Sequence, residues 1–109
     1  MFTVKEVVNG DEIKVEPEWS CEDNDGNLIV GNHVIVFGYR TPQFGMAGYE
    51  FAKKKLEALT QGKEIELYNP QFLKRFGEKI VCSVYLDDVD IANYFPEFKS
   101  NSSLKNYTG

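Results

Sequence analysis

Residues 8–15 have the sequence VNGDEIKV, in which a short polar step separates two runs of alternating apolar residues. Asn9 and Gly10 both tolerate positive φ angles, so together they form a tight turn between antiparallel strands. An Asn-Gly step between such runs is a strong short-range signal of a β-hairpin. We therefore predict that residues 2–8 and 11–15 pair as the first hairpin of a β-sheet.

Further strands are predicted at residues 33–39, 64–68 and 80–86. Each is a short run rich in β-branched and aromatic residues that ends at turn-forming residues. The strand at 64–68 is expected to end at Asn69-Pro70. The segment 16–31 is polar and rich in turn residues, so we expect a long connection between the second and third strands.

One main helix is predicted at residues 48–59. Its apolar residues recur at the i, i+4 and i+7 spacing of one helix face, and they are Ala52, Leu56 and Leu59. A shorter helical segment is expected at residues 91–95, before Pro96. This order of elements is typical of a β-rich α+β fold, the five-stranded oligonucleotide-binding (OB-fold) β-barrel, capped by the main helix and a short C-terminal helical segment. We assign residues 1–98 to this domain and residues 99–109 to a polar C-terminal tail.

The chain is acidic overall, with 17 Asp and Glu against 12 Lys and Arg among 109 residues, a net charge of −5. Because nucleic-acid affinity depends largely on cationic side chains at the phosphates, this charge opposes long-range attraction to nucleic acid. A basic patch would therefore have to be local. Its candidate residues are Lys53, Lys54, Lys55, Lys74, Arg75 and Lys79.

The cellular location of the protein is predicted from two kinds of segment that the sequence lacks. No apolar run approaches the roughly 18 residues of a membrane span, and no signal sequence precedes the first strand. We therefore expect a cytoplasmic protein with no membrane partner. Cys21 and Cys82 have no metal-ligand spacing, so both are expected to be reduced thiols.

Several of these segments together resemble the staphylococcal-nuclease (thermonuclease-like) family. The resemblance is carried by the hairpin sequence at 8–15, by Thr41-Pro42-Gln43 after the third strand, by the helix, by Phe76-Gly77 and by residues 84–88, which fall in the family's order and spacing. It covers residues 2 to about 95. The resemblance implies an SNase-type OB-fold, and a family activity in which phosphodiesters are cleaved with a bound Ca²⁺.

The resemblance also implies where the catalytic groups should lie. The family uses two aspartates and a backbone carbonyl to hold Ca²⁺, a glutamate to activate water, and two arginines to stabilise negative charge. The first aspartate falls on Asp11 and the carbonyl on Thr41, so these two are the candidate metal ligands. The second aspartate falls on Arg40, the glutamate on Gln43 and the first arginine on Ile35.

The second arginine falls on Lys79 only if one residue is inserted, because Glu78 directly follows Phe76-Gly77. The five vestigial positions are therefore Asp11, Ile35, Arg40, Gln43 and Lys79. Losing one charge-stabilising or acid–base group typically costs about 10²- to 10³-fold in rate. We therefore assign no catalytic residue and expect neither a bound cofactor nor calcium-dependent nuclease activity. We also expect the Arg40 guanidinium to occupy the second aspartate's place and to pair with Asp11.

The sequence thus predicts a binding or interaction module with a degenerate active site. Its ligand-binding candidates are Asp11, Tyr39, Arg40, Thr41, Gln43, Phe44 and Lys79. Single-stranded nucleic acid, a nucleotide and a protein are all open as ligands. Two alternatives are a divergent metal-dependent nuclease with a rearranged site, which would use Asp11, Arg40, Gln43 and Lys79, and a purely structural subunit.

Three other features of the sequence carry expectations. Trp19 lies in the 16–31 segment, where it either covers the barrel mouth or is an exposed anchor for a partner. His33 is the only histidine and has no Cys or carboxylate at catalytic spacing, so a structural role is expected. Without the family's long final helix, apolar surface near Ile91, Tyr94 and Phe95 would be uncovered, which suggests a homodimer.

Overall fold

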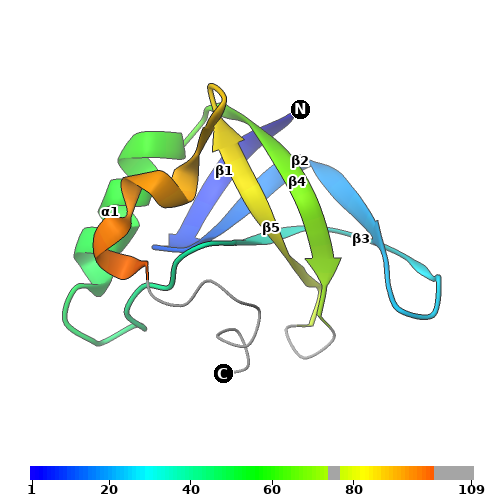
Figure 1. The fold of residues 1–109 in the computed structure, drawn as a ribbon, viewed down its shortest axis with the longest axis horizontal. Helices are drawn as coiled ribbons and strands as arrows, with labels where there is room; N and C mark the ends of the chain where they lie inside the picture. Colours follow the sequence, from blue (N-terminus) through cyan, green and yellow to red (C-terminus); the bar gives the residue numbers. More distant parts are fainter. Residues whose placement is uncertain (74–76, 100–109) are drawn as a thin grey trace.

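The strands of this chain close into a five-stranded mixed β-barrel with one main helix and short 3-10 turns (Figure 1). The computed structural model describes residues 1–73 and 77–99. Its strands are β1 (Phe2–Asn9), β2 (Glu12–Glu22), β3 (Leu28–Val36), β4 (Glu64–Phe72), β5 (Lys79–Leu86) and β6 (Val89–Asp90). Its helices are α1 (Tyr49–Thr60) and the 3-10 segments η2 (Ile91–Tyr94) and η3 (Pro96–Phe98). This architecture confirms the predicted β-rich α+β fold of the OB type.

The strands are hydrogen-bonded in the order β3-β2-β1-β4-β5-β6, and a further pairing of β3 with β5 closes the barrel. The predicted first hairpin is present, but Asn9 is the last residue of β1 and pairs with Glu12, so the turn is Gly10-Asp11, one residue later than predicted. The β3–β5 pairing is parallel and places Ile35 beside Val81. This closure brings residues that are far apart in the sequence onto one continuous sheet surface.

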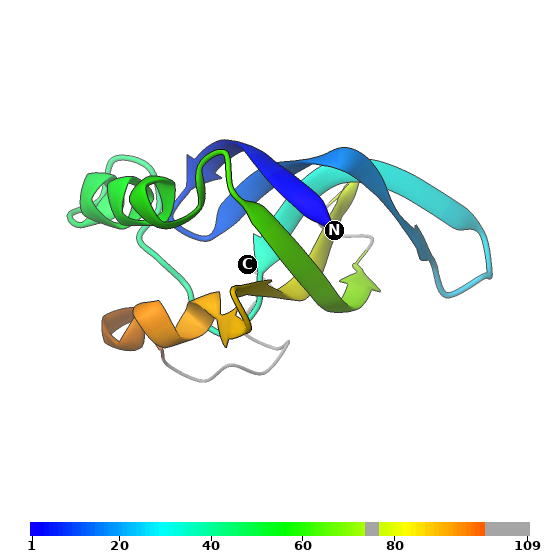
Figure 2. The same ribbon diagram turned by 90° about the horizontal axis from the view of Figure 1, so that it is seen from above.

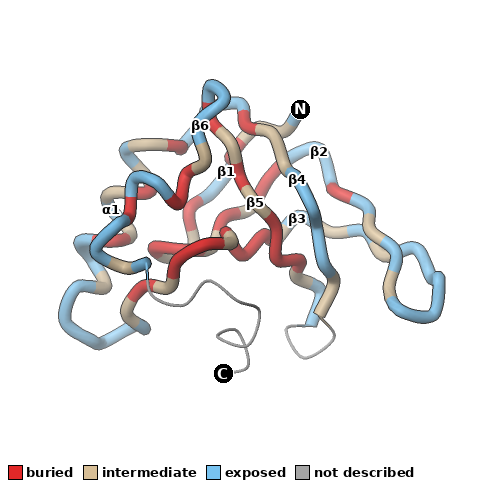
Figure 3. The backbone as a smooth tube through the Cα atoms, viewed as in Figure 1, coloured by how far each residue is buried: buried red, intermediate tan, exposed pale blue. Residues whose placement is uncertain are grey.

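The core fills the barrel interior and the space under the helices (Figure 3). On β5, alternate residues point inward, as the two-residue period of a strand requires; these are Ile80, Cys82, Val84 and Leu86. α1 lies against β1 and buries Ala52, Leu56 and Thr60, while the predicted face residue Leu59 is half-buried against the core. Cys21 and Cys82 are both free thiols, as predicted.

The prediction for the segment 16–31 was wrong. Most of it belongs to a long β2–β3 hairpin that projects beyond the barrel (Figure 2), so the third strand spans Leu28–Val36 instead of 33–39. Polar residues dominate this hairpin because much of its surface faces solvent, which hides the strand pattern. Trp19 anchors it: the side chain is 2% exposed, and its Nε1 donates to the carbonyl of His33 at 3.1 Å. Trp19 is therefore a core residue, and the alternative of an exposed anchor is wrong.

The prediction that the fourth strand ends at Asn69-Pro70 was also wrong. β4 continues to Phe72 after an irregularity between Tyr68 and Gln71 in its pairing with β5. Asn69 takes a positive φ of 55°, a conformation that asparagine tolerates better than most residues. The turn-forming pair therefore bends the strand without ending it.

The C-terminal segment packs closely against the barrel. Ile91 and Phe95 are fully buried, and the ring of Phe95 stacks on Tyr39 with 4.3 Å between the ring centroids. The helical prediction for 91–95 is confirmed by η2, and Pro96 begins η3. Of the three residues whose exposure suggested a homodimer, Ile91 and Phe95 are buried and Tyr94 is 38% exposed.

Two parts of the sequence predictions lie outside the described residues. They are the polar tail beyond Lys99 and the segment 74–76, which contains Lys74, Arg75 and Phe76. Within the described ranges, no helix is long and apolar enough to cross a membrane.

Candidate functional site

The turn after β1 sets the position of Asp11. A Cβ atom at Gly10 would lie 2.6 Å from the Cβ of Ala52 and 2.7 Å from Oγ1 of Thr41, so only glycine allows this close approach. The amide of Asp11 donates to Oδ1 of Asn9 at 2.9 Å, and its carbonyl accepts from the amide of Val36 at 2.8 Å. The Gly10-Asp11 turn thus places Asp11 between the helix and the end of β3.

The carboxylate of Asp11 is buried beside a cation. Asp11 is 4% exposed, and Nη1 of Arg40 lies 3.4 Å from its Oδ2. The amide of Thr41 donates to the same oxygen at 3.4 Å. Burial raises the pKa of Asp11 to about 6, although the charge of Arg40 acts in the opposite direction. The predicted Asp11–Arg40 ion pair is therefore present.

These groups do not fit a calcium ion. Calcium takes six to eight oxygen ligands, usually including several carboxylates. The Asp11 centre offers one carboxylate, whose oxygen already contacts a guanidinium and an amide. In the described part of the chain, no group of three or more His, Cys, Asp or Glu residues is arranged to hold a metal ion.

The position where the resemblance would place the first arginine is apolar. Ile35 and Val81 are cross-strand neighbours in the β3–β5 pairing, and both are almost fully buried. They form a small second cluster, against which Phe37 and Leu73 pack. A hydrocarbon surface therefore stands where a nuclease of this family would need positive charge.

Lys79 joins a polar cluster centred on Glu12, the residue after Asp11. Oε1 of Glu12 accepts from Nζ of Lys79 at 2.9 Å and lies 3.0 Å from Nε2 of His33. Oε2 of Glu12 accepts from the side-chain amide of Asn9 at 2.7 Å. Burial opposes ionisation of Glu12, but the hydrogen bonds from His33, Lys79 and Asn9 outweigh it and lower the pKa to about 2.

Sequence reasoning missed this cluster. It did not identify Glu12 as a site residue or as the carboxylate partner of His33. The four residues come from β1, β2, β3 and β5, and only the β3–β5 register places His33 beside Lys79. The one local signal was the Asn9-x-x-Glu12 spacing across the hairpin turn. That spacing lets an amide reach the carboxylate but says nothing of the other two partners.

The remaining ligand-binding candidates do not gather around Asp11. Tyr39 is 2% exposed, and its hydroxyl donates to the carbonyl of Gly10 at 2.8 Å, so its ring is part of the core and offers no face to a ligand. Gln43 is exposed in the loop before α1. Phe44 is 83% exposed and meets Tyr49 edge-on. Of the seven candidates, Asp11, Arg40 and Thr41 are the ones brought into direct contact.

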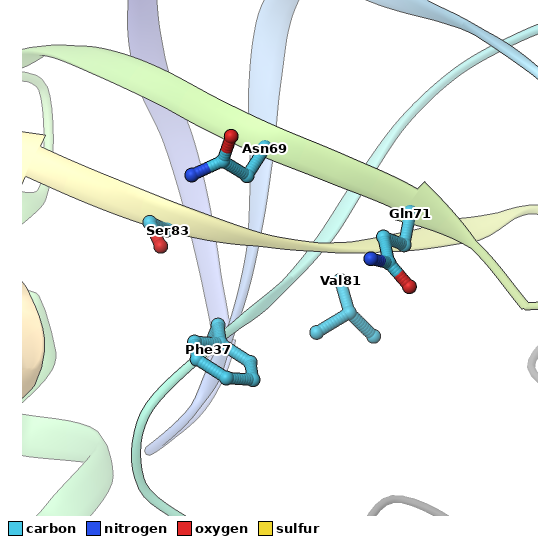
Figure 4. A pocket seen from close by; sticks show the side chains of 5 residues that line it. All are labelled: Phe37, Asn69, Gln71, Val81 and Ser83. Carbon is cyan, nitrogen blue, oxygen red and sulfur yellow. The ribbon is translucent and has the colours of Figure 1, made fainter. Parts of the chain in front are cut away.

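A neutral pocket of about 190 Å³ lies beside the Ile35–Val81 cluster (Figure 4). It is lined by one aromatic ring, two side-chain amides, a hydroxyl and an aliphatic side chain, which belong to Phe37, Asn69, Gln71, Ser83 and Val81. Amides and a hydroxyl both donate and accept hydrogen bonds, whereas none of these five residues carries a charge. Sequence reasoning missed the pocket because it ended the fourth strand before Gln71.

Comparison with known proteins does not assign the chain to a family. No family model matches the chain, and no curated protein matches it.

Proposed function

We propose that this chain is a thermonuclease-like domain without calcium-dependent nuclease activity, which acts as a binding or interaction module. The observation that carries the proposal is the 3.4 Å contact between Arg40 Nη1 and Asp11 Oδ2. A cation in this position repels a divalent metal ion and uses the carboxylate that the metal would need.

The other catalytic requirements also lack suitable groups. Gln43 has an amide where a carboxylate would take a proton from water, and Ile35 has no charge. The ammonium group of Lys79 is bonded to Glu12. Even if such losses are far from additive, each one typically costs about 10²- to 10³-fold in rate, so little of a nuclease's acceleration would be left.

The neutral pocket supports a binding role for the domain. Its ring and amides suit an uncharged planar group, such as a nucleobase, a nucleoside or an aromatic side chain of a protein. Attraction through phosphate groups has less support, because the chain carries a net charge of −5. A ligand would then be held through the uncharged surface of Phe37 and the amides of Asn69 and Gln71.

A cleavage assay tests the absence of nuclease activity. Single-stranded DNA and RNA are incubated with the protein in Ca²⁺, Mg²⁺, Mn²⁺ or EDTA, with the variant Asp11→Ala alongside. We expect no cleavage under any condition. Metal-dependent cleavage that disappears in Asp11→Ala would show a rebuilt catalytic site and would favour the divergent nuclease.

A titration of the same oligonucleotides tests the binding role. If the pocket of Figure 4 holds a base, Phe37→Ala weakens binding, whereas the matched variant Phe51→Ala, whose ring is exposed on α1 outside the pocket, leaves it unchanged. Equal binding by both variants would exclude the pocket. No binding of oligonucleotides, nucleosides or aromatic peptides would favour the structural subunit.

A further inference from the structure

The excess negative charge of the chain lies on the β2–β3 hairpin. No Lys or Arg occurs between Lys14 and Arg40, whereas five acidic residues do. These are Glu16, Glu18, Glu22, Asp23 and Asp25. The rest of the chain has 12 acidic residues against 12 basic ones, so this hairpin accounts for the whole net charge of −5.

The same hairpin has an open strand edge. β3 pairs with β2 along one side, but on its other side it pairs with β5 only from His33 to Val36. Within residues 1–73 and 77–99, no strand covers the outer edge of Leu28–Asn32. This edge belongs to the part of the hairpin that projects beyond the barrel (Figure 2).

The hydrogen bonds at the hairpin tip show which backbone groups face outward. The amide of Asp23 donates to the carbonyl of Asn27 at 2.9 Å, so this pair is a hydrogen-bonded one. In an antiparallel ladder such pairs alternate, and the residues between them direct their N–H and C=O groups to the opposite side. Leu28 and Val30 therefore present their backbone donors and acceptors to the open edge.

This edge lacks the usual protection of edge strands. Natural edges are blunted by lysines, prolines or inward charges, whereas β3 carries no Lys, Arg, Asp, Glu or Pro. Leu28 is 68% exposed and Val30 is 52% exposed, while Ile29 between them packs toward the core. An added strand would thus find backbone partners and two apolar side chains on one face.

A groove of about 320 Å³ lies at the end of the open edge, where β3 begins to pair with β5. Its walls include Val30, Asn32, Glu18 and Glu78. In this groove, Nζ of Lys79 and Nε2 of His33 are directed to Glu12, and Nζ of Lys14 lies 4.0 Å from Glu6. The carboxylates of Glu18 and Glu78 give the groove an acidic wall for a cationic side chain.

We propose that the Leu28–Asn32 edge binds an extended basic segment of a partner protein by strand addition. On the face that carries Leu28 and Val30, its Lys or Arg side chains would pack their aliphatic stems on these two residues and extend their charged ends to Glu22, which is opposite Leu28 on β2, and to Glu18 in the groove. The apolar residues that alternate with them would lie on the Ile29 face of the sheet. A second copy of this chain is the poorer occupant, because two hairpins that each carry five acidic residues repel one another. The inference goes beyond the proposed function, since it uses none of the residues around Asp11 or the neutral pocket.

A peptide titration by fluorescence anisotropy tests the proposal. The probe is fluorescein-labelled acetyl-Lys-Val-Lys-Val-Lys-Val-Lys-amide, and its matched control has the same sequence and charge but N-methyl groups on alternate backbone nitrogens. Because N-methylation removes the donors that an added strand needs, we expect the control to bind at least about tenfold more weakly. Equal affinities would overturn the proposal, since charge alone would then explain the binding.

Two sets of variants sharpen this test. Val30→Pro removes an outward N–H while leaving the bonds to β2, and it should weaken peptide binding by about tenfold. The triple variant Glu16→Gln, Glu18→Gln, Glu22→Gln should weaken binding and reduce its salt dependence. The control triple variant Glu57→Gln, Glu64→Gln, Glu66→Gln has the same net charge and should bind as tightly as wild type. Equal losses in the two triple variants would contradict a specific role for the hairpin.

Amide hydrogen exchange of the wild-type protein gives a readout that does not depend on any variant. The amides of Leu28 and Val30 should exchange rapidly in the free protein and become protected when the unmodified peptide is added. Peptide binding without this protection would place the peptide elsewhere. A homodimer that already protects both amides, detected by sedimentation, would assign the edge to a second copy and would also overturn the proposal.

Discussion

Asp11 and Glu12 are adjacent in the sequence, yet folding shifts the pKa values of their carboxyl groups in opposite directions. The pKa of Asp11 is raised to about 6, whereas that of Glu12 is lowered to about 2. Both lie near cations, Arg40 for the first and Lys79 for the second. The difference lies in hydrogen bonding: Glu12 accepts short bonds from three side chains, while Asp11 is more deeply buried and has two longer contacts of 3.4 Å. A nearby cation alone is thus insufficient to stabilise a buried carboxylate.

Of the variants that test this comparison, Glu12→Gln should change the free energy of unfolding the most. Because folding lowers the pKa of Glu12 from 4.5 to about 2, the ionised carboxylate stabilises the folded state above pH 4.5, and this stability is lost as the pH falls toward 2. At pH 7, the variant should therefore have a free energy of unfolding about 3 kcal/mol lower than that of the wild-type protein. Urea denaturation between pH 3 and pH 7 would measure it, with Glu6→Gln as an exposed control that changes stability by less than about 0.5 kcal/mol. A pH-independent difference would show that the carboxylate's charge is unimportant.

Asp11→Asn should show the opposite dependence on pH. Folding raises the pKa of Asp11 from 3.8 to about 6, so ionisation of Asp11 destabilises the folded state increasingly between these values. Relative to Asp11→Asn, the wild-type protein should therefore lose about 2–3 kcal/mol of unfolding free energy from pH 4 to pH 7. The same denaturation series measures this slope, and a slope of the same sign as that of Glu12→Gln would contradict the comparison.

Arg40→Ala tests the cation at Asp11 directly. The charge of Arg40 lowers the pKa of Asp11 against the effect of burial, so its removal should raise that pKa further. Titration of the Asp11 carboxyl carbon by NMR would report the shift. Lys55→Ala is the matched control, because its ammonium group contacts Glu97 and the Phe95 ring instead. An unchanged Asp11 titration in Arg40→Ala would show that the contact at 3.4 Å is not energetically coupled.

The smallest expected effect concerns metal binding. Calcium should leave the thermal midpoint of the wild-type protein unchanged, whereas Arg40→Asp, which supplies a second carboxylate beside Asp11, should show a rise of about 1–3 °C. Thermal unfolding monitored by circular dichroism with Ca²⁺ or EDTA measures both. The variant Arg40→Asn separates removal of the cation from gain of a carboxylate. A calcium-dependent rise in the wild-type protein would contradict the proposed loss of the metal site.

Local sequence patterns predicted the elements whose signals lie within a few residues. The first hairpin, the helix after residue 48 and the strand at 80–86 are present in the structure, although the turn of the hairpin is Gly10-Asp11 instead of Asn9-Gly10. The β2–β3 hairpin was missed because its strands leave the barrel and face solvent. The continuation of β4 was missed because Asn69 bends the strand where the sequence indicated its end.

The Asp11–Arg40 contact was predicted from the sequence, but the Glu12 cluster and the neutral pocket were not. The contact follows from two positions that the resemblance places in one centre. The cluster and the pocket instead depend on the register of β5 beside β3 and β4, which joins residues 33 and 79, and residues 71 and 81. No periodicity within one segment contains that register, because it depends on packing between distant strands.

The sequence by itself determined the first hairpin, the helix and the barrel class. These features depend on local backbone preferences and on residue identity. The tertiary structure alone decided that Asp11 is buried beside a cation, that Glu12 gathers three donors, and that Leu28 and Val30 have an open edge. Burial and hydrogen-bond partners are properties of neighbours in space, and those neighbours are brought together only when the barrel closes.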